Sequence, residues 1–246
     1  RWLSKAVALP VVRLNVRVSR LERAADDVML VHMALPAGKA FNFRPGQFAK
    51  LRFGQLPVRS YSMANQPGEA ELVFHVRIVP NGAASGHVDK SLQVGDVVEV
   101  QGPFGDAYWD GRKEAPLLLL AGGTGLAPML SVLDAAIKEG QAADQIHLYH
   151  GVRSERDLYA SEYLQSWADQ HGFRFVPVVV EGGGLRNGHL HDVVSGCGEE
   201  CLPIHTLELV GVLQGGAGDR VQPLLVLATL LRVGVEGLAV LLQRLA

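Results

Sequence analysis

Four consecutive leucines at positions 117–120 lead directly into the glycine-rich stretch Ala121-Gly122-Gly123-Thr124-Gly125-Leu126-Ala127-Pro128. An apolar run of this length is typical of a buried strand, and the glycines allow a sharp turn after it. Pro128 suits the first turn of a following helix. Strand, glycine turn and helix in this order predict a parallel sheet with crossover helices, so we expect an α/β domain in the second half of the chain.

The alternation continues beyond this turn. We expect strands over residues 117–121, 146–151 and 173–180, and helices over residues 127–138 and 158–170. In parallel sheets, the carboxyl ends of the strands form the crevice that receives ligands. The glycine stretch and the residues after position 151 are therefore the candidate binding segments of this half.

The first half has a different rhythm, in which turn residues separate short apolar or alternating runs. These runs cover residues 12–18, 28–34, 48–53, 71–79 and 96–101, and a sixth β-like run ends in Arg59-Ser60-Tyr61-Ser62. Strands of this length and spacing predict a small antiparallel barrel. A polar stretch over residues 109–115 separates the halves, which gives a barrel domain at 10–110 and an α/β domain at 115–246.

The composition excludes several classes of function. The 246 residues carry a formal net charge of −2, which provides no basic surface for a nucleic acid. Cys197 and Cys201 supply neither a disulfide framework nor a four-ligand metal site, and the nine histidines show no metal-ligand spacing. No signal peptide is visible, and Arg232 and Glu236 interrupt the apolar tail, so we expect a cytoplasmic protein without a membrane span. Because position 1 is Arg rather than Met, we expect a fragment or a processed product.

The residues that end the sixth β-like run offer a cation, a phenol and hydroxyls. A flavin dinucleotide needs a cation for its pyrophosphate, a flat surface against its ring and a hydrogen-bonding group near its N5 atom. Strand alternation puts Arg59 and Tyr61 on one face and Ser62 on the other, so the three meet one ligand only if the strand ends or twists there. A strand end with an exposed arginine and a half-buried tyrosine is the simpler interpretation of these four residues alone.

A second small-residue turn follows the run over residues 71–79. Gly82-Ala83-Ala84-Ser85 allows backbone amides to approach a phosphate closely. The alternative is an Asn81-Gly82 turn before a helix that Ser85 caps.

The ordered set of motifs resembles the ferredoxin–NADP reductase superfamily, especially the flavin and nicotinamide half of the reductases that serve bacterial aromatic-ring oxygenases. The resemblance covers about residues 11 to 194, and its motifs are Phe43-Arg44-Pro45-Gly46-Gln47-Phe48, Arg59-Ser60-Tyr61-Ser62, Gly82-Ala83-Ala84-Ser85, Gly102-Pro103-Phe104-Gly105, the glycine stretch 121–128 and Gly151-Val152-Arg153-Ser154-Glu155-Arg156-Asp157-Leu158-Tyr159. It implies a six-stranded antiparallel FAD-binding barrel followed by a parallel-sheet NAD(P)H-binding domain. Electrons would pass from NAD(P)H through FAD to an iron–sulfur acceptor.

The same resemblance implies roles for individual residues. Arg59 would hold the FAD pyrophosphate, Tyr61 would pack against the flavin, and Ser62 would hydrogen-bond near N5. Thr124 would face the nicotinamide and the flavin, so Ser62 and Thr124 are the candidate catalytic residues. The other candidate cofactor-binding residues are Ser60, His75, Val76, Arg77, Ile78, Gly82, Ser85, Gly122, Gly123, Gly125 and Pro128. The glycine stretch is not the GxGxxG fingerprint and, as a bare loop, is equally a tight strand-to-helix connection.

The segment after the second parallel strand is expected to meet the adenosine side of the nicotinamide nucleotide, through Arg153 and Ser154. We expect Asp157 to cap the helix that begins near residue 158. Glu155 near a ribose 2′ position would disfavour a 2′-phosphate, whereas Arg153 and Arg156 would tolerate one. The sequence therefore favours NADH over NADPH.

The chain departs from the family in two ways. From about residue 195 the domain is atypical, because the family's Cys-Gly-Pro-Pro-like turn and its acidic–aromatic end are absent. We therefore hypothesise a change of reading frame near residues 195–201. The four cysteines of a plant-type iron–sulfur domain are also absent, so the acceptor cluster is expected on a separate protein or on a preceding segment.

Three alternatives remain open at this stage. The chain is a non-catalytic flavin or nucleotide sensor, an inactive truncated or frameshifted reductase, or a reductase that uses free flavin as a substrate. Residues 82–85, which suit a pyrophosphate, favour bound FAD over free flavin.

Overall fold

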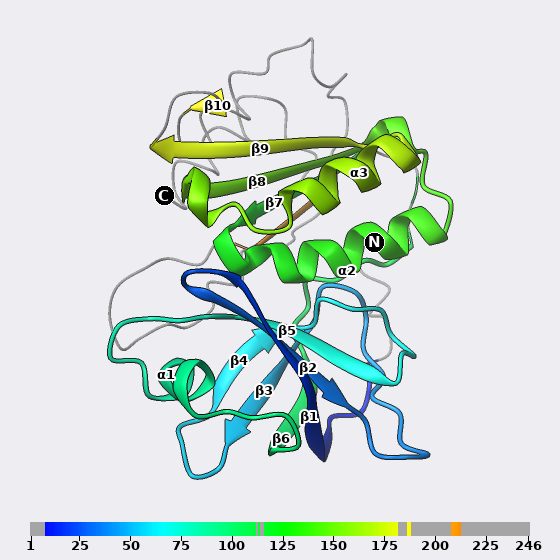
Figure 1. Ribbon diagram of the computed structural model, residues 1–246. Helices are drawn as coiled ribbons and strands as arrows, with labels where there is room; N and C mark the ends of the chain where they lie inside the picture. Colours follow the sequence, from blue (N-terminus) through cyan, green and yellow to red (C-terminus); the bar gives the residue numbers. More distant parts are fainter. Residues whose placement is uncertain (1–7, 112, 114–115, 182–185, 188–207, 213–246) are drawn as a thin grey trace.

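The computed structural model describes residues 8–111, 113, 116–181, 186–187 and 208–212. These residues form a six-stranded sheet and a five-stranded sheet, stacked one above the other in Figure 1. Cys197, Cys201 and the hypothesised frame change at 195–201 lie outside the described residues. Within the described ranges, none of the helices has the length and apolar content needed to cross a membrane.

The six-stranded sheet is antiparallel, with strand order β4-β3-β6-β1-β2-β5. Its strands are β1 (Val12–Ala25), β2 (Val28–Ala34), β3 (Phe48–Phe53), β4 (Arg59–Ser62), β5 (Glu71–Arg77) and β6 (Val97–Phe104). A bridge between Met63 and Phe74 joins the two outer strands, β4 and β5. The sheet therefore closes into the antiparallel barrel that the sequence predicted.

Alternation along the strands builds the barrel core. In β3, Ala49, Leu51 and Phe53 are buried while Lys50 and Arg52 are exposed. Each large apolar side chain that is removed from water in this way stabilises the fold by about 1.5–3 kcal/mol. The core thus follows directly from the period-two pattern in the sequence.

Helix α1 (Ala83–Lys90) lies beside the barrel and follows the turn at Asn81 and Gly82. Gly82 is the N-cap residue, and Ser85 lies inside the helix, where its hydroxyl accepts a hydrogen bond from the Val79 amide at 3.2 Å. The prediction that Ser85 caps this helix is therefore wrong. Gly82 is required, because a Cβ atom there would lie 2.5 Å from Val79 Cγ2 and closer still to Ser85 Oγ.

The five-stranded sheet is parallel, with strand order β10-β9-β8-β7-β11. Its strands are β7 (Leu117–Gly122), β8 (Ile146–Ser154), β9 (Arg174–Glu181), β10 (Arg186–Asn187) and β11 (Glu208–Val212). Short 3₁₀ turns lie at η1 (Gly123–Gly125), η2 (Ala143–Gln145) and η3 (Glu155–Asp157). The order runs one way from β7 to β10 and then returns to β11, so the end of β7 is a topological switch point where such sheets bind ligands.

Two helices cross over between the first three parallel strands, as the sequence predicted. They are α2 (Leu126–Lys138), with Pro128 in its first turn, and α3 (Ser161–His171). Residues 158–160 precede α3 rather than belonging to it, since Ala160 adopts a left-handed conformation with φ of 61°. Asp157 does not cap α3; its carboxylate accepts hydrogen bonds from the Ser154 amide and hydroxyl, and so stabilises η3.

Helix α2 lies between the parallel sheet and the barrel in Figure 1. The core beneath it includes Val28 of β2, with Ala24, Ala25 and Leu30 packed against it. Apolar packing therefore continues from the α/β domain onto the outer face of the barrel.

Candidate functional site

Strand β4 carries the first candidate residues. It pairs with β3 so that Arg59 is opposite Leu51 and Tyr61 is opposite Ala49, which puts both on the same face of the sheet, as alternation predicted. Ser60 and Ser62 face Lys50 and Phe48 on the other side. Tyr61 packs against the barrel core, and this burial raises the pKa of its phenol to about 12 despite the nearby Arg59 charge.

Arg59 itself lies exposed at the start of β4. Its guanidinium donates a hydrogen bond to the Val58 carbonyl at 3.1 Å and has no carboxylate partner among the residues that the structure describes. A cation without a counter-ion beside an aromatic ring is suited to a phosphate group.

Strand β5 lies at the other closing edge of the barrel. Leu72, Phe74 and Val76 alternate into the barrel core, so Val76 leaves only its backbone for a ligand. His75 lies on the opposite face and is nevertheless buried, because the α/β domain covers it. Its Nδ1 atom lies 2.9 Å from the Tyr159 hydroxyl, so the His75 side chain takes part in a hydrogen bond between the two domains.

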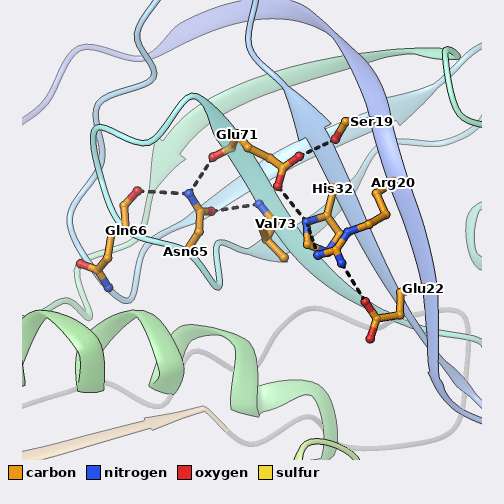
Figure 2. A network of polar contacts seen from close by, with 8 residues as sticks. All are labelled: Ser19, Arg20, Glu22, His32, Asn65, Gln66, Glu71 and Val73. Carbon is orange, nitrogen blue, oxygen red and sulfur yellow. Dashed lines mark hydrogen bonds and ion pairs between the residues drawn. The ribbon is translucent and has the colours of Figure 1, made fainter. Parts of the chain in front are cut away.

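A polar network fixes the segment that leads into β5, and Figure 2 shows its members. Asn65 donates to the Glu71 carbonyl at 2.7 Å and accepts from the Val73 amide at 2.9 Å. His32 Nδ1 lies 2.9 Å from a Glu71 carboxylate oxygen. Burial acts to raise the pKa of Glu71, but hydrogen bonds from Ser19 and His32 and the nearby charges of His32 and Arg20 together lower it. β5 is thus held in register from both sides.

The same segment reaches the second domain. Gln66 donates to the Ser131 carbonyl at 2.6 Å, and the Ser131 hydroxyl donates to the Asn65 carbonyl at 2.7 Å. Ser131 is fully buried in α2. The barrel and the α/β domain are therefore joined by reciprocal hydrogen bonds next to β5.

The far end of β5 lies beside the glycine loop η1. Arg77 Nε forms an ion pair with Asp27 Oδ2 at 3.0 Å, and the Asp27 carbonyl accepts the Ile78 amide at 2.7 Å. A Cβ atom built on Gly123 would lie 3.9 Å from Arg77 Nη1. Residues that the sequence assigned to the flavin and to the nucleotide are thus neighbours here.

A pocket of about 450 Å³ opens at the start of α1. It is lined by Ile78, Val79, Pro80, Asn81, Gly82, Gly86, Asp89 and Lys90. A Cβ atom on Gly86 would meet nothing within 4 Å, so this glycine leaves space on the pocket side. Ser85 is buried and does not line the pocket.

The glycine loop follows β7 at the switch point of the parallel sheet. Gly123 has φ of 51°, a left-handed conformation that favours glycine, and Thr124 is buried in η1. His150 Nε2 lies 3.1 Å from the Gly123 carbonyl, and the Tyr159 hydroxyl lies 3.4 Å from it. Pro128 is buried in α2.

Burial dominates the ionisation of this cluster. It lowers the pKa of His75 to about 3 and that of His150 to about 4, and it raises the pKa of the Tyr159 phenol. All three side chains are therefore neutral at physiological pH.

The last candidates lie at the carboxyl end of the central strand β8, which ends at Ser154, and in the turn η3 that follows it. Arg153, Glu155 and Arg156 are exposed. Ser154 is the N-cap of η3, and its hydroxyl is bonded to Asp157. Arg153 and Glu155 thus present exposed charges here, Arg156 lies 3.9 Å from the Asp157 carboxylate, and the Ser154 hydroxyl already has a structural partner.

Sequence reasoning missed three residues of this region: Asp27, His150 and Tyr159. Tyr159 was inside a quoted motif, and His150 was inside a predicted strand, but neither signalled a contact with the glycine loop. That contact depends on folding, since His75 and Tyr159 are 84 residues apart in the chain.

Comparison with known protein families gives one match in each half of the chain. The family described as "Oxidoreductase FAD-binding domain" matches residues 15–109. The family described as "Oxidoreductase NAD-binding domain" matches residues 119–194.

Curated relatives are reductase components. The chain is 40% identical over 182 residues to the ferredoxin–NAD(P)+ reductase component of the naphthalene 1,2-dioxygenase and salicylate 5-hydroxylase systems of a Ralstonia species, covering 72% of this chain and 55% of that protein. It is 36% identical over 208 residues to reductase component 1 of terephthalate 1,2-dioxygenase from a Comamonas species, covering 77% and 61%. The chain thus spans little more than half the length of these curated relatives.

Solved structures agree with these matches. A cytochrome P450 reductase from Amycolatopsis superposes with a TM-score of 0.71 at 32% identity, covering 84% of this chain and 62% of that one. The ferredoxin reductase in carbazole 1,9a-dioxygenase superposes with a TM-score of 0.70 at 28% identity, covering 81% and 61%.

Proposed function

Because the chain belongs to the ferredoxin–NADP reductase superfamily, oxygenase-reductase type, we propose that it passes electrons from NAD(P)H through FAD to an iron–sulfur acceptor. The observation that carries the proposal is the approach of β5 to the glycine loop, where Arg77 borders Gly123. A barrel strand and a nucleotide-domain switch point then share one boundary, as direct transfer between two cofactors requires.

The chain's own residues fit FAD. Arg59 offers an exposed cation for the pyrophosphate, and Tyr61 offers a half-buried ring beside it. Gly82 and Gly86 line the pocket at the start of α1, where backbone can approach a phosphate closely. When bound, FAD would supply a two-electron acceptor for the nicotinamide hydride and a one-electron donor for the iron–sulfur centre.

The proposed residue roles are those that the family resemblance implies. Arg59, Ser60 and Tyr61 bind the dinucleotide, and the backbone of residues 75–78 lines its ring, since the His75 and Val76 side chains are already buried elsewhere. Ser62 and Thr124 are assigned to the reacting atoms. The protein contributes orientation and local electrostatics rather than a covalent step.

For the nicotinamide nucleotide we propose NADH. Gly122, Gly123 and Gly125 offer backbone at the switch point, and Arg153 and Ser154 are the last two residues of β8. Glu155 is exposed there, and its negative charge would repel a 2′-phosphate, although Arg153 and Arg156 are exposed beside it. We also propose that the protein works in the cytoplasm, where NADH is available.

The proposed electron acceptor is an iron–sulfur protein or domain of an aromatic-ring oxygenase system. The relatives named above are reductase components of such systems, which supports this class of partner. The described residues include no cysteine that could ligate a cluster, so the cluster must be carried by another segment or another protein.

The test is the visible spectrum of the full chain, reconstituted with FAD, before and after anaerobic NADH. We expect a bound-flavin spectrum that bleaches on addition of NADH and bleaches less readily with NADPH. A bound flavin that stays oxidised would instead support the non-catalytic sensor. No bound flavin would remove the assignment of Arg59 to Ser62.

A further inference from the structure

We propose that Tyr159 is a positioning residue for hydride transfer, because its hydroxyl connects His75 on barrel strand β5 to the Gly123 carbonyl in the glycine loop. Tyr159 follows η3 in the α/β domain and is buried. The inference rests on the proposed function, since it concerns the alignment of the same two cofactor-binding domains.

The Gly123 carbonyl is the centre of the arrangement. A carbonyl oxygen only accepts hydrogen bonds, so His150 must carry its single ring proton on Nε2, 3.1 Å away. Its Nδ1 atom is buried and has no hydrogen-bond partner among the described residues, which agrees with an unprotonated nitrogen there. The low pKa of His150 keeps the ring in this neutral form at physiological pH.

Tyr159 completes the set of donors. If His75 carries its proton on Nδ1, that nitrogen donates to the Tyr159 oxygen at 2.9 Å, and the phenol donates to Gly123. This assignment uses the ring proton of each histidine and the hydroxyl proton of Tyr159. The Leu126 amide of the backbone also donates to Gly123, so three donors converge on one oxygen.

Hydrogen bonds that hold the Gly123 carbonyl oxygen also fix the backbone conformation of the glycine loop. In a trans peptide the carbonyl of Gly123 and the amide of Thr124 point in opposite directions, so holding the carbonyl inside orients the Thr124 amide. Gly123, with φ of 51°, has no side chain to restrict its dihedral angles. The peptide plane at the switch point therefore depends on donors supplied by His150 and Tyr159.

Local backbone strain accompanies the contact. Ala160, the residue after Tyr159, is held at φ of 61°, which is unfavourable for any residue with a Cβ atom. The two rings of His75 and His150 also meet the Tyr159 ring edge-on, with centroids 5.4 and 5.5 Å away. Tyr159 is thus packed between His75 of the barrel and His150 of its own domain.

The experiment compares Tyr159→Phe with the wild type, using the full chain reconstituted with FAD. We expect unchanged FAD content and a limiting rate of anaerobic flavin reduction by NADH that falls about tenfold, because a small misplacement of reacting atoms is costly. The NADH concentration at half-maximal rate should change less than twofold. Tyr163→Phe is the matched control, because Tyr163 is 59% exposed on α3, and it should leave the rate unchanged.

A second pair of variants separates positioning from simple packing. His150→Gln keeps an N–H donor near the position of Nε2, whereas His150→Leu removes it. We expect the glutamine variant to retain most of the reduction rate and the leucine variant to lose it. Equal rates in the two variants, or a wild-type rate in Tyr159→Phe, would overturn the proposal.

Hydrogen exchange gives a readout that needs no reaction. In Tyr159→Phe, amides of residues 122–126 should exchange faster than in the wild type, while amides of β3 should not. If NADH fails to reduce the wild-type flavin, the proposed function fails. Hydrogen exchange still tests whether the Tyr159 hydroxyl holds the glycine loop. Unchanged exchange at residues 122–126 would refute the role of Tyr159 by itself.

Discussion

The closing edge of the barrel and the glycine loop are the two regions proposed to meet the cofactors, and they are built in opposite ways. β4 is held by backbone hydrogen bonds to β3 and presents to solvent the Arg59 charge, which has no carboxylate partner in the described part of the chain. The glycine loop is partly buried, with Thr124 and Gly125 inside, and it is held by the neutral side chains of His150 and Tyr159. One region therefore attracts a ligand by charge, and the other holds backbone in a fixed shape.

This difference predicts different sensitivities. An exposed cation is screened by salt but keeps its charge over the whole accessible pH range. Buried neutral histidines are indifferent to salt but resist protonation. The following experiments test whether the two regions respond as separately as their construction implies.

The largest expected effect is on stability at mildly acidic pH. In the folded state the pKa values of His75 and His150 are about 3 and about 4, below the value near 6.5 of an unfolded chain. Stability is therefore complete above about pH 6.5 and falls as the unfolded chain takes up protons, by about 2 kcal/mol per histidine between pH 7 and pH 5. Urea denaturation across this range measures the change.

His150→Gln should remove about half of this pH dependence, since one of the two titrating rings is gone. His171→Gln, at the exposed end of α3, is the control for the loss of a histidine side chain. A stability that stays constant from pH 7 to pH 5 would contradict the burial of both rings.

The next effect concerns charge at the barrel edge. Arg59→Ala should weaken FAD binding by about 2 kcal/mol, or roughly thirtyfold, because a charge-assisted contact with phosphate is lost. Titration of the apoprotein with FAD measures the affinity. Arg13→Ala is the matched control, since Arg13 is an exposed arginine on β1 paired with Glu99 at 3.7 Å.

The salt dependence of FAD binding is a second test of the Arg59 contact. Raising the ionic strength should weaken FAD binding in the wild type more than in Arg59→Ala, because the variant has lost the screened interaction. Equal salt dependence in both proteins would argue that Arg59 does not contact the pyrophosphate.

A pair of glycines tests the turn beside the pocket. Gly82→Ala should destabilise the fold by about 2 kcal/mol, since its Cβ atom would clash with Val79 and Ser85. Gly86→Ala should stabilise it by up to about 1 kcal/mol, since the added methyl group meets open space within a helix. Denaturant unfolding of both variants distinguishes them, and effects of the same sign would contradict the close packing at Gly82.

The smallest effect is expected beside the glycine loop. Ala160→Gly should stabilise the fold by about 0.5–1 kcal/mol, because glycine adopts the left-handed conformation at Ala160 without strain. Ala168→Gly, inside α3 and buried, should instead destabilise it. Thermal unfolding compares the two, and destabilisation by Ala160→Gly would mean that the methyl group of Ala160 packs favourably.

Local pattern explains what the sequence could predict. Phe48–Phe53 alternates cleanly, and the strand found there has the predicted bounds. The turn after Leu117–Gly122 was also recognised, because glycines mark a sharp strand-to-helix connection. Helix ends were less accurate, since the left-handed Ala160 has no local sequence signal and delays α3 until Ser161.

Contacts between distant segments explain what the sequence could not predict. β11 pairs with β7 from about ninety residues away, and no clear periodicity marked Glu208–Val212 as a strand. His75 was assigned to the flavin from its motif, but its side chain is bonded to Tyr159 of the other domain. Alternation identified its face of β5, whereas only the folded chain shows what covers that face.

The bridge between Met63 and Phe74 has a consequence beyond the site. It lets the two outermost strands of the six-stranded sheet end against each other instead of leaving two long open edges. Open edges recruit foreign strands and seed aggregates. The contact that places strand β4 beside β5 thereby also protects the barrel against pairing with other chains. The proposed alignment for electron transfer and the resistance to aggregation therefore depend on the same closure of the barrel.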